Sequence, residues 1–120
     1  MTRSLVVKVT CGADDPERCN QGFMVATMAV TAGAEVSLWL AGEAAWFALP
    51  GKAEEFRLAG ATPLAELRDA VLAGGRLTVC SQCAERRSIG AHAVLPGVRV
   101  AGAATFTEEV LADGVRALVY

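Results

Sequence analysis

The sequence has little histidine, no basic run and no nucleotide-binding loop. Its single histidine, His92, is accompanied by no GxSxG motif, which leaves serine-hydrolase chemistry with little support. Eleven basic and 13 acidic residues give a formal net charge of −2 and do not cluster, which argues against a nucleic-acid partner. GxxxxGK[ST] and GxGxxG motifs are absent, so the usual nucleotide loops are excluded.

The sequence also lacks a long apolar run. Its longest uncharged stretch, residues 19–34, is shorter than the ~20 residues that a membrane-spanning helix needs, and it contains polar side chains. The first residues do not form a signal-peptide pattern, because Lys8 interrupts their apolar part. We therefore expect a cytoplasmic protein that binds neither a membrane nor nucleic acid.

Apolar residues and cysteines are what the chain does have. Hydrophobic residues make up 53% of it and the mean hydropathy is +0.39, which excludes a disordered chain. Its 120 residues suit one compact domain, which we expect to span residues 1–120. Four cysteines in a cytoplasmic protein are more often reactive, metal-bound or buried than joined as a disulfide framework.

Short apolar runs alternate with helical patterns along the whole chain. Strands are predicted at residues 4–10, 34–41, 76–80, 97–103 and 115–120. Helices are predicted at residues 16–32, 42–49 and 63–73, from residue 81, and from residue 107. Because strands and helices alternate and some strands are almost entirely apolar, we expect a three-layer α/β/α sandwich with a mostly parallel five-stranded sheet.

Cysteines stand at the ends of two predicted strands, where open parallel sheets place their functional sites. Cys80 ends the strand at 76–80 and begins the next helix, where backbone N–H groups and the helix dipole favour a thiolate. Arg86 and Arg87 add positive charge about two turns further on. This pattern predicts a reactive thiol at Cys80, and the alternative is a small core residue.

The remaining cysteines have less definite roles. Cys83 lies one helical turn from Cys80, where it either resolves a disulfide or packs in the helix. Cys11 follows the first strand and is a candidate supporting thiol, whereas Cys19 lies on the core side of its helix.

Structural zinc needs four ligands, typically in two close pairs, and only Cys80 and Cys83 form such a pair. We expect neither a bound metal nor a cofactor.

Four segments together resemble the DsrE/DsrF/TusD-like family of small sulfur-relay proteins. They are LVVKVTCGADDPERC, AGAEVSLWLAGEA, LTVCSQCAERRS and VRVAGAATFTEEVLADGVRALVY, and the resemblance covers nearly the whole chain. It implies an α/β/α fold with a five-stranded parallel sheet, homo-oligomers that are often trimers or hexamers, and a persulfide on Cys80 followed by the pair Arg86 and Arg87. Ser88 stands where the relay motif has Gly, and Cys83 resembles the CxxC-bearing branch of the family.

Three interpretations stay open from the sequence. In the first, the protein is a sulfur carrier or sulfurtransferase whose Cys80 accepts sulfane sulfur from a donor protein and passes it to an acceptor. In the second, Cys80 and Cys83 serve a thiol–disulfide redox or sensor protein. In the third, the protein is a non-catalytic oligomeric binding module with an incidental cysteine.

Self-association is a separate expectation. Met24 and Met28 lie off the core side of their predicted helix, and Trp46 and Phe47 lie in a segment with one charge. A 120-residue monomer would expose both groups, and large exposed apolar patches usually mark interfaces. We expect a homotrimer or homohexamer, with a dimer as the fallback.

Overall fold

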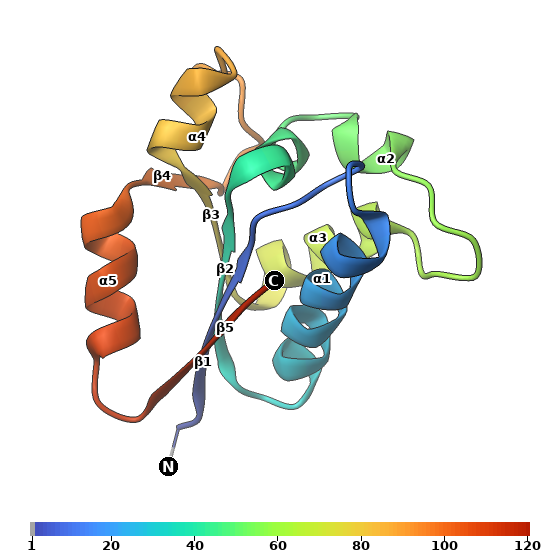
Figure 1. Ribbon diagram of the computed structural model, residues 1–120. Helices are drawn as coiled ribbons and strands as arrows, with labels where there is room; N and C mark the ends of the chain where they lie inside the picture. The colour runs from blue at the N-terminus through green and yellow to red at the C-terminus, as the bar shows by residue number, and fades with distance from the viewer. Residues whose placement is uncertain (1) are drawn as a thin grey trace.

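The computed structural model describes residues 2–120, in which five strands form one sheet (Figure 1). In spatial order the strands are β4 (Arg99–Ala101), β3 (Arg76–Cys80), β2 (Glu35–Leu40), β1 (Ser4–Val9) and β5 (Val115–Val119). Every neighbouring pair runs parallel. The prediction of a five-stranded parallel sheet is confirmed.

Helices cover the sheet from both sides. α1 (Pro16–Thr31) and α3 (Leu64–Gly74) lie on one side, and α5 (Ala103–Leu111) lies on the other (Figure 1). The 3-10 helix η1 (Gly42–Ala48), the short α2 (Lys52–Glu55) and α4 (Ser81–Arg86) lie toward the carboxyl ends of the strands (Figure 1). This arrangement is the predicted three-layer sandwich. No described helix is long and apolar enough to span a bilayer.

The two faces of the sheet differ in chemistry. Side chains alternate along a strand, so each strand contributes to both faces. The face toward α1 and α3 carries the fully buried core residues Val7, Val9, Leu38, Leu40, Leu77 and Val79. The face toward α5 carries Lys8, Ser37 and Thr78, and α5 itself has no buried residue. Most of the apolar core therefore lies on the side of α1 and α3, whereas the side of α5 combines the buried Trp39 and Val6 with these polar residues.

Two helix boundaries differ from the predicted ones. α3 begins at Leu64 because Pro63, with φ −52° and ψ 131°, is extended and stands before the helix, where no side chain caps it. α5 begins at Ala103, directly after the extended Gly102, and not at Thr107. Alanine is the strongest helix former, so the residues after Gly102 extend the helix by one turn toward its N-terminus.

The expectation of an exposed Phe47 is wrong. η1 folds back over the carboxyl ends of the strands, and Phe47, which is only 5% exposed, packs edge-on against Phe23 and Phe56. Gly42 permits the sharp turn into η1: its φ is 52°, and a Cβ there would lie 2.2 Å from the carbonyl oxygen of Thr10. Met28, in contrast, is 56% exposed as expected.

Candidate functional site

Cys80 stands at the junction of β3 and α4. Its backbone is extended, with φ −62° and ψ 122°, and the helix begins at the next residue, Ser81. Its side chain is half-buried, whereas the other three cysteines are buried. The accessible thiol of Cys80 thus lies at the carboxyl end of β3. The first N–H groups of α4, which begins there, have no hydrogen-bond partner within the helix.

The surroundings of Cys80 favour its ionised form. Burial raises the pKa of the Cys80 thiol, but the backbone N–H groups of Cys83 and Gln82, the thiol of Cys83 and the ammonium of Lys8 act in the opposite direction. The net result is a pKa below the ordinary value. A larger fraction of this cysteine is therefore a thiolate at neutral pH than of an unperturbed cysteine, and the thiolate is the nucleophile.

Cys83 lies directly beside this sulfur. It is 9% exposed, and both its backbone N–H and its thiol face Cys80. Both cysteines are free thiols. The structure therefore brings together the two residues of the CxxC motif, one half-buried and one buried.

Cys11 and Cys19 form a different environment. Burial raises the pKa of both thiols, and the nearby Asp14 and Asp15 raise them further. Cys11 also raises the pKa of Cys19, which places these two sulfurs near each other. Because β2 lies between β1 and β3, the strand that leads to Cys11 lies about 10 Å from β3. Cys11 is therefore grouped with Cys19, on the far side of β2 from β3.

The arginine pair is split between two surroundings. Arg87 donates from Nε to Oε2 of Glu43 over 2.8 Å and from Nη1 to the carbonyl oxygen of Cys83 over 3.2 Å. Glu43 also accepts from Nε1 of Trp46 over 3.3 Å. Arg86 is exposed. Arg87 therefore ties α4 to η1, with its guanidinium directed to Glu43.

The backbone conformation of Ser88 explains why glycine suits this position of the relay motif. Its φ is 56°, in the left-handed region that L-residues seldom adopt. The N–H of Ser88 donates to the carbonyl of Glu85, and the N–H of Ile89 donates to the carbonyl of Ala84, over 3.1 and 2.9 Å. These two bonds are those of a Schellman motif, whose left-handed residue is usually glycine. Ser88 thus ends α4 at an energetic cost that glycine avoids.

Sequence reasoning missed the polar group beneath α5. Glu109 is half-buried and accepts from Ser37 Oγ over 2.6 Å, from Trp39 Nε1 over 3.0 Å and from Arg99. Burial raises the pKa of Glu109, but these hydrogen bonds outweigh it and hold the pKa below its ordinary value. The sequence offers one signal of a polar face: each of two adjacent strands carries a polar residue among apolar neighbours, Lys8 on β1 and Ser37 on β2.

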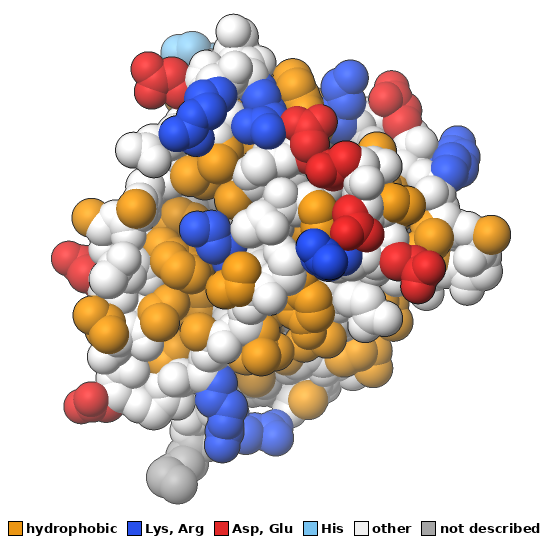
Figure 2. Space-filling model, viewed as in Figure 1, with side chains coloured by type: hydrophobic (Ala, Val, Ile, Leu, Met, Phe, Trp, Pro, Cys, Tyr) orange, Lys and Arg blue, Asp and Glu red, His pale blue; other side chains and the backbone are white. Residues whose placement is uncertain are grey.

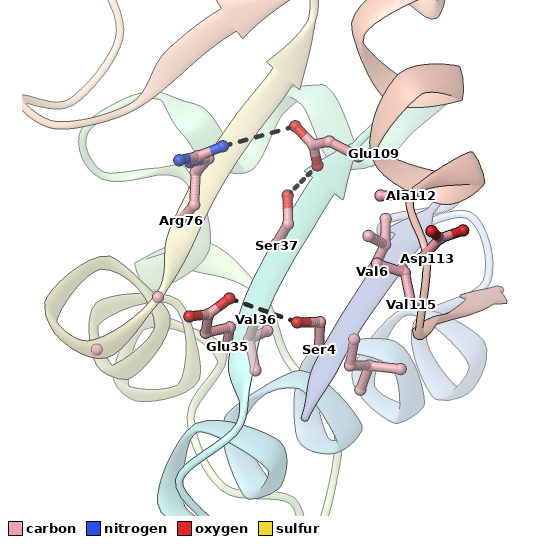
Figure 3. Close-up of a pocket in the computed structure, with 13 residues that line it drawn as sticks. Ser4, Val6, Glu35, Val36, Ser37, Arg76, Glu109, Ala112, Asp113 and Val115 are labelled. Carbon is pink, nitrogen blue, oxygen red and sulfur yellow. Dashed lines mark hydrogen bonds and ion pairs between the residues drawn. The ribbon is translucent and has the colours of Figure 1, made fainter. Parts of the chain in front are cut away.

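A cavity of about 590 Å³ lies away from the cysteines (Figure 3). It opens between the amino-terminal halves of β1 and β2 and the end of α5. Arg76 and Glu109 approach each other over it at 3.8 Å, and Ser4 donates to Glu35 over 3.4 Å. No cysteine lines it. Ligand sites in open parallel sheets gather at the carboxyl ends of the strands, so we place the site at Cys80.

Metal-binding potential is low in the part of the chain that the structure describes. Within residues 2–120, no three His, Cys, Asp or Glu side chains gather closely enough to hold a metal ion. One carboxylate near the Cys80 end of the sheet, Glu43, is instead in an ion pair with Arg87.

Fold and site together define a class: small parallel α/β sandwiches in which a half-buried cysteine joins the third strand to a short helix. The sequence matches the model of the DsrE/DsrF-like family over residues 3–120. The chain belongs to this family, which confirms the resemblance drawn from its segments. No curated protein matches the sequence.

Two solved structures share the fold. The YchN protein from E. coli superimposes with a TM-score of 0.82 at 14% identity, covering 99% of this chain and 100% of that chain. BT1422, a conserved protein of unknown function from Bacteroides thetaiotaomicron, superimposes with a TM-score of 0.60 at 17% identity, covering 98% and 94%. At these identities the likeness concerns the fold alone.

Proposed function

We propose that this protein is a sulfur carrier in which Cys80 accepts a sulfane sulfur as a persulfide and passes it on. The observation that carries the proposal is the placement of Cys80: a half-buried thiol with a lowered pKa at the carboxyl end of β3. Membership of the DsrE/DsrF-like family supports a role in sulfur relay.

The chemistry needs no group beyond the thiol. The Cys80 thiolate attacks the outer sulfur of a donor persulfide, R–S–SH. The new S–S bond forms at Sγ of Cys80 as the donor S–S bond breaks, and the donor leaves as the thiolate RS⁻. A thiolate of an acceptor repeats the exchange and returns Cys80 to its starting state. A low leaving-group pKa speeds this second step.

Mass spectrometry after treatment with inorganic polysulfide tests the proposal. We expect the peptide that contains Cys80 to gain one sulfur atom, and Cys80→Ala to lose this gain while Cys11→Ala, a matched removal of another thiol, keeps it. Loss of two hydrogens across Cys80 and Cys83 supports the redox alternative. No change at any cysteine contradicts both and leaves the binding-module interpretation.

The redox alternative has one observation in its favour. The Cys83 thiol lies beside the sulfur of Cys80, at the spacing of thioredoxin-like motifs. Attack of Cys83 on a Cys80 persulfide would form the disulfide and release hydrosulfide, HS⁻, so the two functions compete for one intermediate. Cys83→Ala separates them: a carrier keeps its persulfide for longer in this variant, whereas a dithiol enzyme loses its disulfide.

We also propose that a second copy of this chain covers β5 and α5. β5 is an edge strand on which Leu118 is 41% and Val119 64% exposed, and Leu111 on the adjacent α5 is 75% exposed. Figure 2 shows apolar side chains gathered on this side of the molecule. Apolar edge strands left uncovered pair with other chains, and a closed oligomer removes the edge. The family resemblance favours a trimer or hexamer.

Light scattering tests this second proposal. We expect a mass above that of the monomer at micromolar concentration, and a fall toward the monomer in Val119→Lys. Met28→Lys is the matched control, because Met28 is exposed on α1 on the other side of the sheet. A monomer mass for the unaltered protein would contradict the proposal, and dissociation by Met28→Lys alone would move the interface to α1.

A further inference from the structure

Lys8 is a half-buried cation without a carboxylate partner. It lies on β1, on the sheet face that α5 covers, and its Nζ lies 4.6 Å from the ring centroid of Phe106. None of the ion pairs within residues 2–120 includes Lys8. An ammonium over an aromatic face is attracted by the ring and loses part of its hydration. The ring of Phe106 therefore holds this charge on the sheet face.

The strand register places Lys8 near Cys80. Lys8 pairs with Trp39, and Trp39 pairs with Thr78, so Lys8 and Thr78 lie at the same level of the sheet. Cys80 follows two residues later on β3 and, because side chains alternate, points to the same face. The two Cα atoms are separated by two strand spacings, about 10 Å, and by about 7 Å along the strand. A lysine side chain is long enough to bring its charge well inside that separation.

The two arginines on this face share one carboxylate. Arg99 from β4 and Arg76 from β3 both bind Glu109 from α5. The group that faces Cys80 from α4 is the thiol of Cys83. Lys8 is thus the cation on this face, among residues 2–120, that makes no ion pair with a carboxylate. The ammonium of Lys8 attracts a negative charge that forms at Cys80. Water and salt screen this attraction little, because the site is partly desolvated.

We infer that Lys8 is the charge partner of the Cys80 thiolate, held in place by the ring of Phe106. The inference rests on the proposed function, since it takes Cys80 as the working thiol. Lys8 acts through the ionisation of Cys80 and does not touch the transferred sulfur, so it is a positioning residue. The lowering of the pKa of Cys80 by Lys8 agrees with the geometry.

The rate of Cys80 alkylation by iodoacetamide, measured across pH, tests the inference. Lys8→Met is expected to slow the reaction about twofold to threefold at pH 7, the effect of a shift of a few tenths of a pKa unit, and to leave the rate at high pH unchanged. Lys8→Arg should restore the rate. The chain has one other lysine, so Lys52→Met is a control with the same change in net charge. A Lys8→Met profile that overlays that of the unaltered protein, or one lowered equally at all pH values, would overturn the inference.

A second measurement avoids dependence on the folding of Lys8→Met. With ¹³C-labelled lysine, the unaltered protein gives two Cε resonances, from Lys8 and Lys52. The Lys8 resonance should shift as Cys80 ionises, and Cys80→Ser should abolish that shift while the Lys52 resonance shows none in either protein. Absence of the shift at Lys8 would overturn the inference.

Both experiments report ionisation and not sulfur transfer. If Lys8→Met slows alkylation but the unaltered protein gains no sulfur from polysulfide, the inferred charge pair stands and the proposed carrier function fails. If the protein gains sulfur but Lys8→Met leaves the alkylation rate unaltered, the carrier function stands and the charge pair fails. The two failures are therefore distinguishable.

Discussion

Arg87 and Glu43, 44 positions apart in the sequence, are joined by an ion pair of 2.8 Å. This contact fastens the helix that follows Cys80 to the 3-10 helix that follows β2. The arginine side chain is 21% exposed and the glutamate side chain 44%, so water weakens the attraction but does not remove it. The contact thus links α4, which begins directly after Cys80, to η1.

Glu43→Gln should therefore destabilise the protein by about 1 kcal/mol, because the charge-assisted bond from Nε of Arg87 is weakened. The free energy of unfolding in urea measures the change. Glu85→Gln is the matched control, since the Glu85 side chain is exposed on α4 and makes no ion pair among the described residues. Equal destabilisation by the two variants would show that the Arg87–Glu43 pair contributes nothing of its own.

Ser88→Gly should stabilise the protein by about 1 kcal/mol. A left-handed backbone costs an L-residue roughly 1–2 kcal/mol, and glycine recovers most of it, less the extra entropy of its unfolded chain. Ser88→Ala should bring no gain, because alanine keeps the strain at φ 56°. Thermal unfolding of the three proteins checks this. An unchanged or lower midpoint for Ser88→Gly would be evidence against the Schellman geometry at the end of α4.

Glu109→Gln should lower stability at neutral pH by about 1–3 kcal/mol, because the bonds from Ser37, Trp39 and Arg99 lose their charged acceptor. The pKa of Glu109 is lowered in the folded protein, so the unfolded chain binds the proton more readily. The contribution of this carboxylate is therefore complete above its unfolded pKa and is lost as the pH falls through the lower folded value. Urea unfolding of both proteins should show a gap that narrows in acid. A gap that is constant down to pH 3 would contradict this account.

The position of Cys80 in the fold is easier to predict from the sequence than the residues around it. The junction at Cys80 follows from an apolar strand pattern that runs directly into a helical pattern, both of which are local signals. Glu109 and Lys8 escape sequence reasoning because their roles depend on which face of the sheet α5 covers. The burial of Phe47 also escapes sequence reasoning, because composition does not show that η1 folds back onto the core.

Cysteine roles show the same limit. Cys80 and Cys83 come together because one helical turn separates them, which the spacing predicts. The distance between Cys11 and Cys80 depends on the order of strands in the sheet. In the order observed, β2 separates the strands that lead to them.

Elemental analysis of the purified protein should find no stoichiometric zinc. Structural zinc sites use four ligands, and Cys80 and Cys83 supply two. The other cysteines lie beyond β2, where aspartates and burial raise the pKa of their thiols and so disfavour the thiolate that zinc binds. One zinc per chain that is lost in Cys83→Ala would contradict the prediction.

The most direct test of the central claim, that Cys80 is the working nucleophile, is the order in which the four cysteines of the folded protein react with iodoacetamide at pH 7. Peptide mass mapping at short times identifies each labelled thiol. We expect Cys80 to react first, because it is half-buried with a lowered pKa, while Cys11, Cys19 and Cys83 are buried. Faster labelling of Cys11 or Cys83 would place the site elsewhere, and labelling of all four only after denaturation would show that Cys80 is a core residue.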